Sequence, residues 1–118
     1  MPAKENVITK TEDFIQWFLP KIDKFPRNYK FLFGDRIIQI QLDLLEQLIE
    51  AYFKKEKVEH LRAANVEIEK LRHLIKICVG MKFITIDQYE FASRGLNDIG
   101  GLVGGWIRFQ TGKAHEPV

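Results

Sequence analysis

Apolar side chains recur at helical spacing along almost the whole chain. In the third quarter, steps of three and four residues join Leu61, Ala64, Ile68, Leu71, Ile75 and Cys78. In the last quarter, the same steps join Tyr89, Ala92, Leu96, Ile99, Val103 and Trp106. Stripes of this kind are typical of amphipathic helices that pack against one another at shallow angles. The pattern predicts four helices, at about residues 11–24, 28–55, 58–80 and 86–110.

Breaks in the pattern separate the four predicted helices. Phe25-Pro26 ends the first helix, because the residue before a proline is pushed out of the helical region. The charged residues 54–57 connect the second helix to the third, and residues 80–85 connect the third to the fourth. We expect an all-α protein, an up-down-up-down four-helix bundle that forms a single domain over residues 1–118.

Several residues have backbone preferences that bear on the ends and interiors of these helices. Thr11 is a suitable N-cap for the first helix, and Gly112 and Pro117 are expected to close the last. Pro20 lies inside the first helix, where it is expected to produce a kink. Five of the eight glycines fall in the last helix, at Gly95, Gly100, Gly101, Gly104 and Gly105. Each costs about 1 kcal/mol relative to alanine, so we expect another backbone close to this helix or a break near Gly100.

The distribution of charge shows a feature that the composition conceals. The chain has 118 residues, one cysteine and a net charge of +2, values that suit one globular domain without a disulfide framework. Residues 20–34 carry a local charge of +3, and residues 70–86 carry a local charge of +4. Positive charge is therefore gathered in two clusters. Because no signal pattern or membrane-length apolar run is present, we expect a cytoplasmic protein with no membrane partner.

The two basic clusters are candidates for nucleic-acid binding. The first lies at a helix junction beside Tyr29, Phe31 and Phe33, and basic side chains next to aromatic rings can hold a phosphate backbone and stack an unpaired base. The second lies largely opposite the apolar stripe of the third helix, with Glu69 placed to pair with Arg72 or His73. A solvated charged face is the plainer explanation of this second cluster. The candidate nucleic-acid-binding residues are Lys21, Lys24, Arg27, Lys30, Arg36, Arg62, Arg72, His73 and Lys76.

Apolar residues exceed what one small core requires. The excess lies in residues 31–33, in the broad apolar face of the second helix and in the face that carries Trp17 and Leu19. Surplus apolar surface on a small bundle usually means self-association. A larger core, built from kinked and closely packed helices, would also absorb it. The candidate residues for an oligomer interface are Trp17, Phe31, Phe33 and Trp106.

The sequence contains no convincing pattern for catalysis, a metal or a cofactor. A phosphate-binding loop needs a preceding strand and a lysine followed by serine or threonine, and the glycine cluster has neither. The three histidines are not spaced as metal ligands, and Cys78 occupies a core position of its stripe. Arg108 and His115 match the Arg-to-His spacing of HEPN-type helical ribonucleases, but Gly112 lies between them and a tail histidine is not held in catalytic geometry. We expect a protein that is not an enzyme and has no cofactor.

Three segments resemble a known family. Residues 19–27 (LPKIDKFPR) and 29–37 (YKFLFGDRI) resemble the signature of the accessory variability determinant (Avd) family of bacterial diversity-generating retroelements. Residues 102–107 (LVGGWI) are similar to the C-terminal helix of that family, and the resemblance spans residues 8–110. A related family, encoded in intervening sequences of large-subunit ribosomal RNA genes, shares the four-helix fold and a similar ending. The Lys-Phe-Pro-Arg sequence within residues 19–27 favours the retroelement family.

The resemblance implies a specific function. Avd-type proteins are non-enzymatic four-helix bundles that assemble as homopentameric barrels with a basic surface. They bind the reverse transcriptase and the template RNA of the element and support error-prone cDNA synthesis during mutagenic retrohoming. The expected partners are therefore a reverse transcriptase, template RNA or DNA, and further copies of the chain. The alternatives are an RNA-binding protein of the ribosomal-RNA intervening-sequence type and, with less support, a helical ribonuclease.

Overall fold

The computed structural model of the chain describes the backbone of residues 2–115 and the side chains of residues 6–112. Its four long helices are α1 (Pro2–Ile22), α3 (Asp35–Phe53), α4 (Val58–Gly80) and α5 (Ile86–His115). The short helix α2 (Arg27–Tyr29) and the π-helix η1 (Lys30–Gly34) lie between α1 and α3. No strand occurs within residues 2–115, so the predicted all-helical class is confirmed there.

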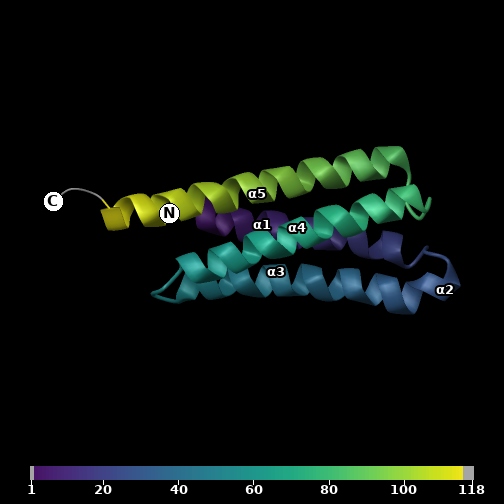
Figure 1. Cartoon of the computed structure of the whole chain (residues 1–118), viewed down its shortest axis with the longest axis horizontal. Helices are drawn as coiled ribbons and strands as arrows, with labels where there is room; N and C mark the ends of the chain where they lie inside the picture. Colours follow the sequence, from purple (N-terminus) through teal and green to yellow (C-terminus); the bar gives the residue numbers. More distant parts are fainter. Residues whose placement is uncertain (1, 116–118) are drawn as a thin grey trace.

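The long helices run back and forth along an elongated bundle that measures 57 × 23 × 20 Å (Figure 1). Helix α1 packs against α3 and α5, and α4 packs against the same two helices. The turn that follows α1 and the turn that follows α4 come to one end of the bundle, and the connection from α3 to α4 lies at the other end (Figure 1). None of the helices over residues 2–115 is long and apolar enough to cross a membrane.

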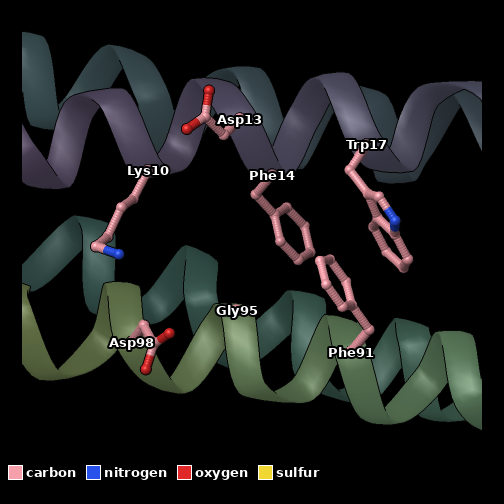
Figure 2. A pocket seen from close by; sticks show the side chains of 7 residues that line it. All are labelled: Lys10, Asp13, Phe14, Trp17, Phe91, Gly95 and Asp98. Carbon is pink, nitrogen blue, oxygen red and sulfur yellow. The ribbon is translucent and has the colours of Figure 1, made fainter.

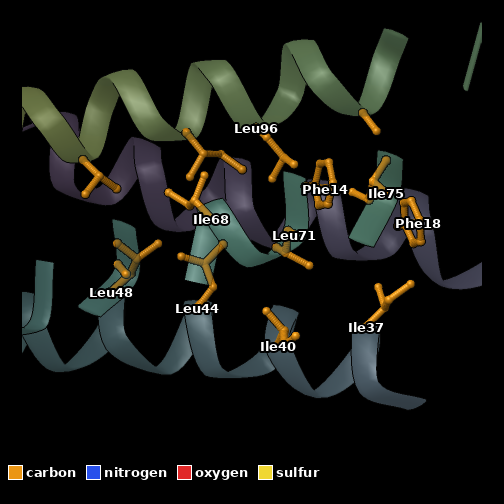
Figure 3. Close-up of a cluster of buried hydrophobic side chains, with 14 of the residues drawn as sticks. Phe14, Phe18, Ile37, Ile40, Leu44, Leu48, Ile68, Leu71, Ile75 and Leu96 are labelled. Carbon is orange, nitrogen blue, oxygen red and sulfur yellow. The ribbon is translucent and has the colours of Figure 1, made fainter. Parts of the chain in front are cut away.

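The core is formed by the apolar stripes that the sequence predicts. Every member of the α4 stripe is at most 1% exposed, and the α5 stripe is buried from Ala92 to Trp106. Figure 3 shows that Phe14 and Phe18 of α1 lie among side chains from α3, α4 and α5. Because a fully buried large apolar side chain contributes about 1.5–3 kcal/mol, these stripes determine how the four helices face one another.

Helix α1 differs from the prediction at its N-terminal end. It begins at Pro2, so Thr11 is in the interior of the helix and is not its N-cap. The Thr11 side chain is completely buried, and its Oγ1 donates a hydrogen bond to the carbonyl of Val7 at 2.8 Å. This bond satisfies the hydroxyl locally and leaves the methyl group for the core. Pro20 lies in the last turn of α1, two residues before the helix ends at Ile22.

The connection from α3 to α4 lies where the charged residues predict it. Lys57 supplies the C-terminal cap of α3, since its Nζ donates hydrogen bonds to the carbonyls of Ala51, Tyr52 and Lys54 at 2.7–3.1 Å. Carbonyls of the last turn have no partner inside the helix, and a cation is favourable at the negative end of the helix dipole. One lysine therefore satisfies three carbonyls where α3 ends, since the backbone becomes extended at Lys54 after Phe53.

The single second helix predicted at residues 28–55 is divided into α2, η1 and α3. The chain nevertheless stays helical from residue 27 to residue 53, and at the end of η1 it approaches Ile22 closely at Gly34. Gly34 is buried, and a Cβ atom built there would lie 2.7 Å from Cγ2 of Ile22. Only glycine allows the end of η1 to pack this closely against the end of α1.

Replacing Gly34 with alanine is expected to lower the free energy of unfolding by about 1–3 kcal/mol, because the new methyl group overpacks a site whose neighbour is a branched core side chain. Gly101→Ala is the matched control, since no heavy atom lies within 4 Å of a Cβ atom at that position. The control is expected to raise stability by about 0.5–1 kcal/mol through helix propensity. Urea unfolding of both variants, followed by circular dichroism, measures the difference. Equal effects at the two positions would contradict the packing at Gly34.

Helix α5 is continuous through its glycines and does not break near Gly100. The atoms that approach these glycines most closely from other helices are side-chain atoms of Phe14 and Arg72, near Gly95 and Gly100. The predicted close approach of another backbone is therefore wrong for the residues that the structure describes. Helix α5 also continues past Gly112 to His115, so Gly112 does not close it, and Pro117 lies outside the described residues.

Candidate nucleic-acid interface

The first basic cluster lies at one end of the bundle, where α1, α2, η1 and α3 meet (Figure 1). Lys24, Arg27 and Arg36 are exposed there. Exposed apolar side chains lie in the same segment, with Leu32 82% exposed and Phe31 63% exposed. We call the exposed basic, aromatic and leucine side chains of this segment the junction surface, which consists of Lys24, Arg27, Tyr29, Phe31, Leu32 and Arg36; the carboxylates of Asp23 and Asp35 are exposed beside them.

Packing against the α4–α5 connection holds the junction surface in place. The ring of Phe83 lies at the centre, with ring centroids 5.2 Å from those of Phe25 and Tyr29 and 6.2 Å from that of Phe33. Offset and edge-on aromatic pairs at these distances are favourable. Phe33 is consequently half-buried, while Phe31 projects into solvent.

Two lysines of the first cluster are engaged within the chain. Lys30 forms a salt bridge with Asp23 at 2.8 Å, and this hydrogen-bonded charge holds the pKa of Asp23 below its usual value. Lys21 donates to the carbonyl of Trp17 at 3.0 Å and lies 4.1 Å from the centre of the Trp17 ring. Within residues 6–112, Arg27 and Arg36 form no salt bridge. The structure therefore favours the exposed cations over Lys21 and Lys30 as contacts for an anionic partner.

The second basic cluster faces a groove between α4 and α5. This α4–α5 groove has a volume of 330 Å³ and is lined by Glu69, Arg72, His73, Ile75, Lys76, Tyr89, Ser93, Leu96 and Asn97. Glu69 contacts both predicted neighbours, with its carboxylate 3.0 Å from Arg72 and 3.7 Å from Nε2 of His73. Arg62 is exposed on α4 but does not line the groove, since it is ten residues before Arg72 and about 15 Å away along the helix.

The four residues proposed for an oligomer interface have different environments. Phe31 is exposed, and Phe33 is half-buried against Phe83. Trp17 is half-buried, with its ring 4.5 Å from that of Phe91 on α5. Trp106 is 0% exposed, so its proposed place at an interface is wrong for this fold. Its position in the α5 stripe explains the burial, because the same spacing that predicts a helix also predicts a core side chain.

Trp17 and Phe91 meet across a small cavity between α1 and α5. Figure 2 shows the two rings near Phe14, with Lys10 and Asp98 farther along the two helices; Asp13 also lines the cavity, but its carboxylate points away from α5. The cavity has a volume of 210 Å³. Because Trp17 contacts Phe14, Phe18 and Phe91, most of its apolar surface serves packing within the chain.

Sequence reasoning missed the α5 side of the α4–α5 groove. Tyr89, Ser93 and Asn97 line it, and Asn97 accepts a hydrogen bond from Nη2 of Arg72 at 3.2 Å. The signal available was their spacing, because residues four apart share a helix face. The pairing of that face with the basic side of α4 depends on how the helices pack, which the spacing does not determine.

The residues examined in the sequence for metal binding and catalysis lie apart in the structure. No group of three or more His, Cys, Asp or Glu side chains within them could hold a metal ion. Burial raises the pKa of the Cys78 thiol to about 12, which suits its predicted role as a small buried hydrophobe. The guanidinium of Arg108 lies along its own helix, near Gly104 and Gly105, and the side chain of His115 lies outside the described residues.

Comparison with known proteins identifies the family. A family model described as bAvd-like matches residues 7–110, which include parts of all four long helices, the junction surface and both sides of the α4–α5 groove. A comparison with curated proteins finds no match. The match agrees with the resemblance in residues 19–27 and 29–37 and covers most of the chain. The chain belongs to the bAvd-like family.

Proposed function

We propose that the chain is a non-catalytic accessory protein that binds a reverse transcriptase and its template RNA in the cytoplasm and supports mutagenic retrohoming by a diversity-generating retroelement. The observation that carries the proposal is the bAvd-like match over residues 7–110. The four-helix fold agrees with it, since Avd-type proteins are four-helix bundles that act as accessory factors.

The junction surface supports the RNA-binding part of the proposal. It combines exposed cations with exposed side chains of Tyr29, Phe31 and Leu32 on a segment fixed by Phe83. Cations can neutralise phosphates while aromatic rings stack unpaired bases. Binding of this kind releases counterions, so its affinity falls steeply as salt rises.

We further propose that the working unit is a homopentamer. Exposed apolar side chains support self-association, because they remain after the four helices have formed a complete core. The most exposed are Leu32, Phe53 and Ile86, at 82%, 79% and 68%. Five copies would carry a net charge of about +10, and symmetry would repeat each basic surface around the assembly.

Co-expression with the reverse transcriptase of the proposed retroelement tests the proposed function directly. The two proteins are expected to co-purify, and light scattering after size exclusion should give five copies of this chain with and without RNA. A protein that binds RNA but leaves the transcriptase free would instead fit the ribosomal-RNA intervening-sequence type. RNA cleavage that disappears in His115→Ala would show a ribonuclease and overturn the proposal.

A further inference from the structure

We propose that the α4–α5 groove binds a phosphodiester of single-stranded RNA, with Arg72 held ready by α5 and Glu69 limiting the affinity. The inference rests on the proposed function, because RNA is taken as the partner, and it assigns the contact to a defined groove. The junction surface is a separate surface, and none of its residues lines the groove.

Arg72 is held in place by one residue of its own helix, Glu69, and by one residue of the opposite helix, Asn97. Its Nη1 donates to Glu69 at 3.0 Å, and its Nη2 donates to Oδ1 of Asn97 at 3.2 Å. The guanidinium also fills the space that a side chain at position 100 would take, since a Cβ atom built on Gly100 would lie 3.1 Å from Nη2. A guanidinium fixed before binding loses less conformational entropy when it meets a phosphate.

The carboxylate of Glu69 already lies against two basic side chains in this part of the groove. One oxygen lies 3.0 Å from Arg72, and the other lies 3.7 Å from Nε2 of His73. Arg72, His73 and Glu69 all remain partly exposed, and Lys76 is exposed beside them. An incoming phosphate therefore meets three basic side chains and one opposing carboxylate.

The other wall of the groove suits a single strand. Tyr89 is half-buried and offers a ring for stacking, and Ser93 and Asn97 offer groups for hydrogen bonding. A volume of 330 Å³ falls in the range of small-ligand sites and is enough for a nucleotide unit. A duplex keeps its bases stacked inside the helix, so none of them would be available to stack on the ring of Tyr89.

Two adjacent glycines provide a matched test of the Arg72 position. Both Gly100→Ala and Gly101→Ala add a methyl group and helix propensity to α5, but only the first pushes against Arg72. Because the guanidinium is the end of a flexible side chain, it should move without loss of the fold. We expect Gly100→Ala to weaken binding of a labelled single-stranded RNA oligonucleotide roughly three- to tenfold, with Gly101→Ala changing it less than about twofold.

Two charge substitutions test the groove itself, each with a control on the same helix or beside it. Lys76→Gln should weaken RNA binding roughly three- to tenfold and reduce the slope against log salt by about 0.7, the value for one lost phosphate contact on a single strand. Lys55→Gln removes the same charge at the other end of α4 and should leave the affinity nearly unchanged. Glu69→Gln keeps an acceptor for Arg72 and should tighten RNA binding roughly three- to tenfold. Its control, Glu59→Gln, removes the same charge from α4 outside the groove and should change the affinity much less.

Fluorescence anisotropy at several salt concentrations measures all six variants, and thermal unfolding verifies that each is folded. If the wild-type chain binds RNA and each variant behaves like its control, the groove assignment is wrong while the proposed function stands. Weaker binding by Glu69→Gln would overturn its role as an opposing charge. If the wild-type chain binds an acidic peptide but no RNA, both the proposed function and this inference fail.

Discussion

Replacing Trp106 with alanine is expected to lower the free energy of unfolding by about 3–5 kcal/mol, the usual cost of removing a buried tryptophan or phenylalanine ring. Trp106 is the largest fully buried side chain among the described residues. Its loss would leave a cavity in the core near the C-terminal part of α5. Urea unfolding at fixed protein concentration measures the change, because self-association makes the midpoint depend on concentration.

Two further variants show whether the effect comes from packing. Phe31→Ala removes an exposed ring and should change the free energy of unfolding by less than about 0.5 kcal/mol. Trp106→Phe keeps most of the volume and removes Nε1, which has no hydrogen-bond partner among the described residues. Trp106→Phe should therefore lower the free energy of unfolding much less than Trp106→Ala does. A Trp106→Phe variant that unfolds normally but no longer self-associates would return Trp106 to the interface and contradict its burial.

Replacing Lys24, Arg27 and Arg36 together with glutamine is expected to weaken RNA binding by one to two orders of magnitude at low salt. If each cation contacts one phosphate, the slope of log affinity against log salt should fall by about 2, since each contact on a single strand contributes about 0.7. The fold should persist, because all three side chains are exposed. Anisotropy titrations between low and high salt measure both quantities.

The matched control for this triple variant removes three exposed lysines elsewhere. Lys10, Lys54 and Lys55 lie outside both basic clusters, so their replacement with glutamine makes the same change in net charge. Affinity that depended on net charge alone would fall equally in both variants. That result would remove the junction surface from the RNA interface.

The sequence predicts the core of this fold well because the buried side chains of a helix recur at regular spacing along the chain. The α4 stripe from Leu61 to Cys78 is buried as predicted, and the charged residues 54–57 form the connection where they were expected. Both depend on local rules: residues three and four apart share a face, and charged side chains are costly to bury.

Two of the predictions that differ from the structure concern helix boundaries, which depend on how the helices pack together. Thr11 has the chemistry of an N-cap, yet the helix continues through it, and the side chain is buried in the bundle with its hydroxyl bonded to the carbonyl of Val7. The π-helical turn η1 ends at Gly34, which packs closely against Ile22 of α1, and no local spacing reveals that contact.

The candidate sites also combine features that depend on local sequence with features that depend on tertiary packing. The sequence places Lys24, Arg27 and Phe31 at a helix junction, and in the structure all three side chains are exposed there. The hydrogen bond between Arg72 and Asn97 joins residues 25 positions apart on different helices. Such a contact can be known only once the neighbours of each helix are known.

The π-helix has a consequence for how this protein can change length. A π-helical turn holds about one residue more than an α-helical turn, so η1 contains one residue that a regular helix would not need. Deleting one residue from this segment could join α2 to α3 as continuous α-helix. Everything before the deletion would then rotate by about 100° about the helix axis, and Tyr29 would leave Phe83. Helix α1 also precedes the deletion, and its Phe14 and Phe18 lie in the core, so such a rotation would conflict with the packing of α1 against α3 and α5. A single-codon deletion here is therefore expected to destabilise the whole bundle.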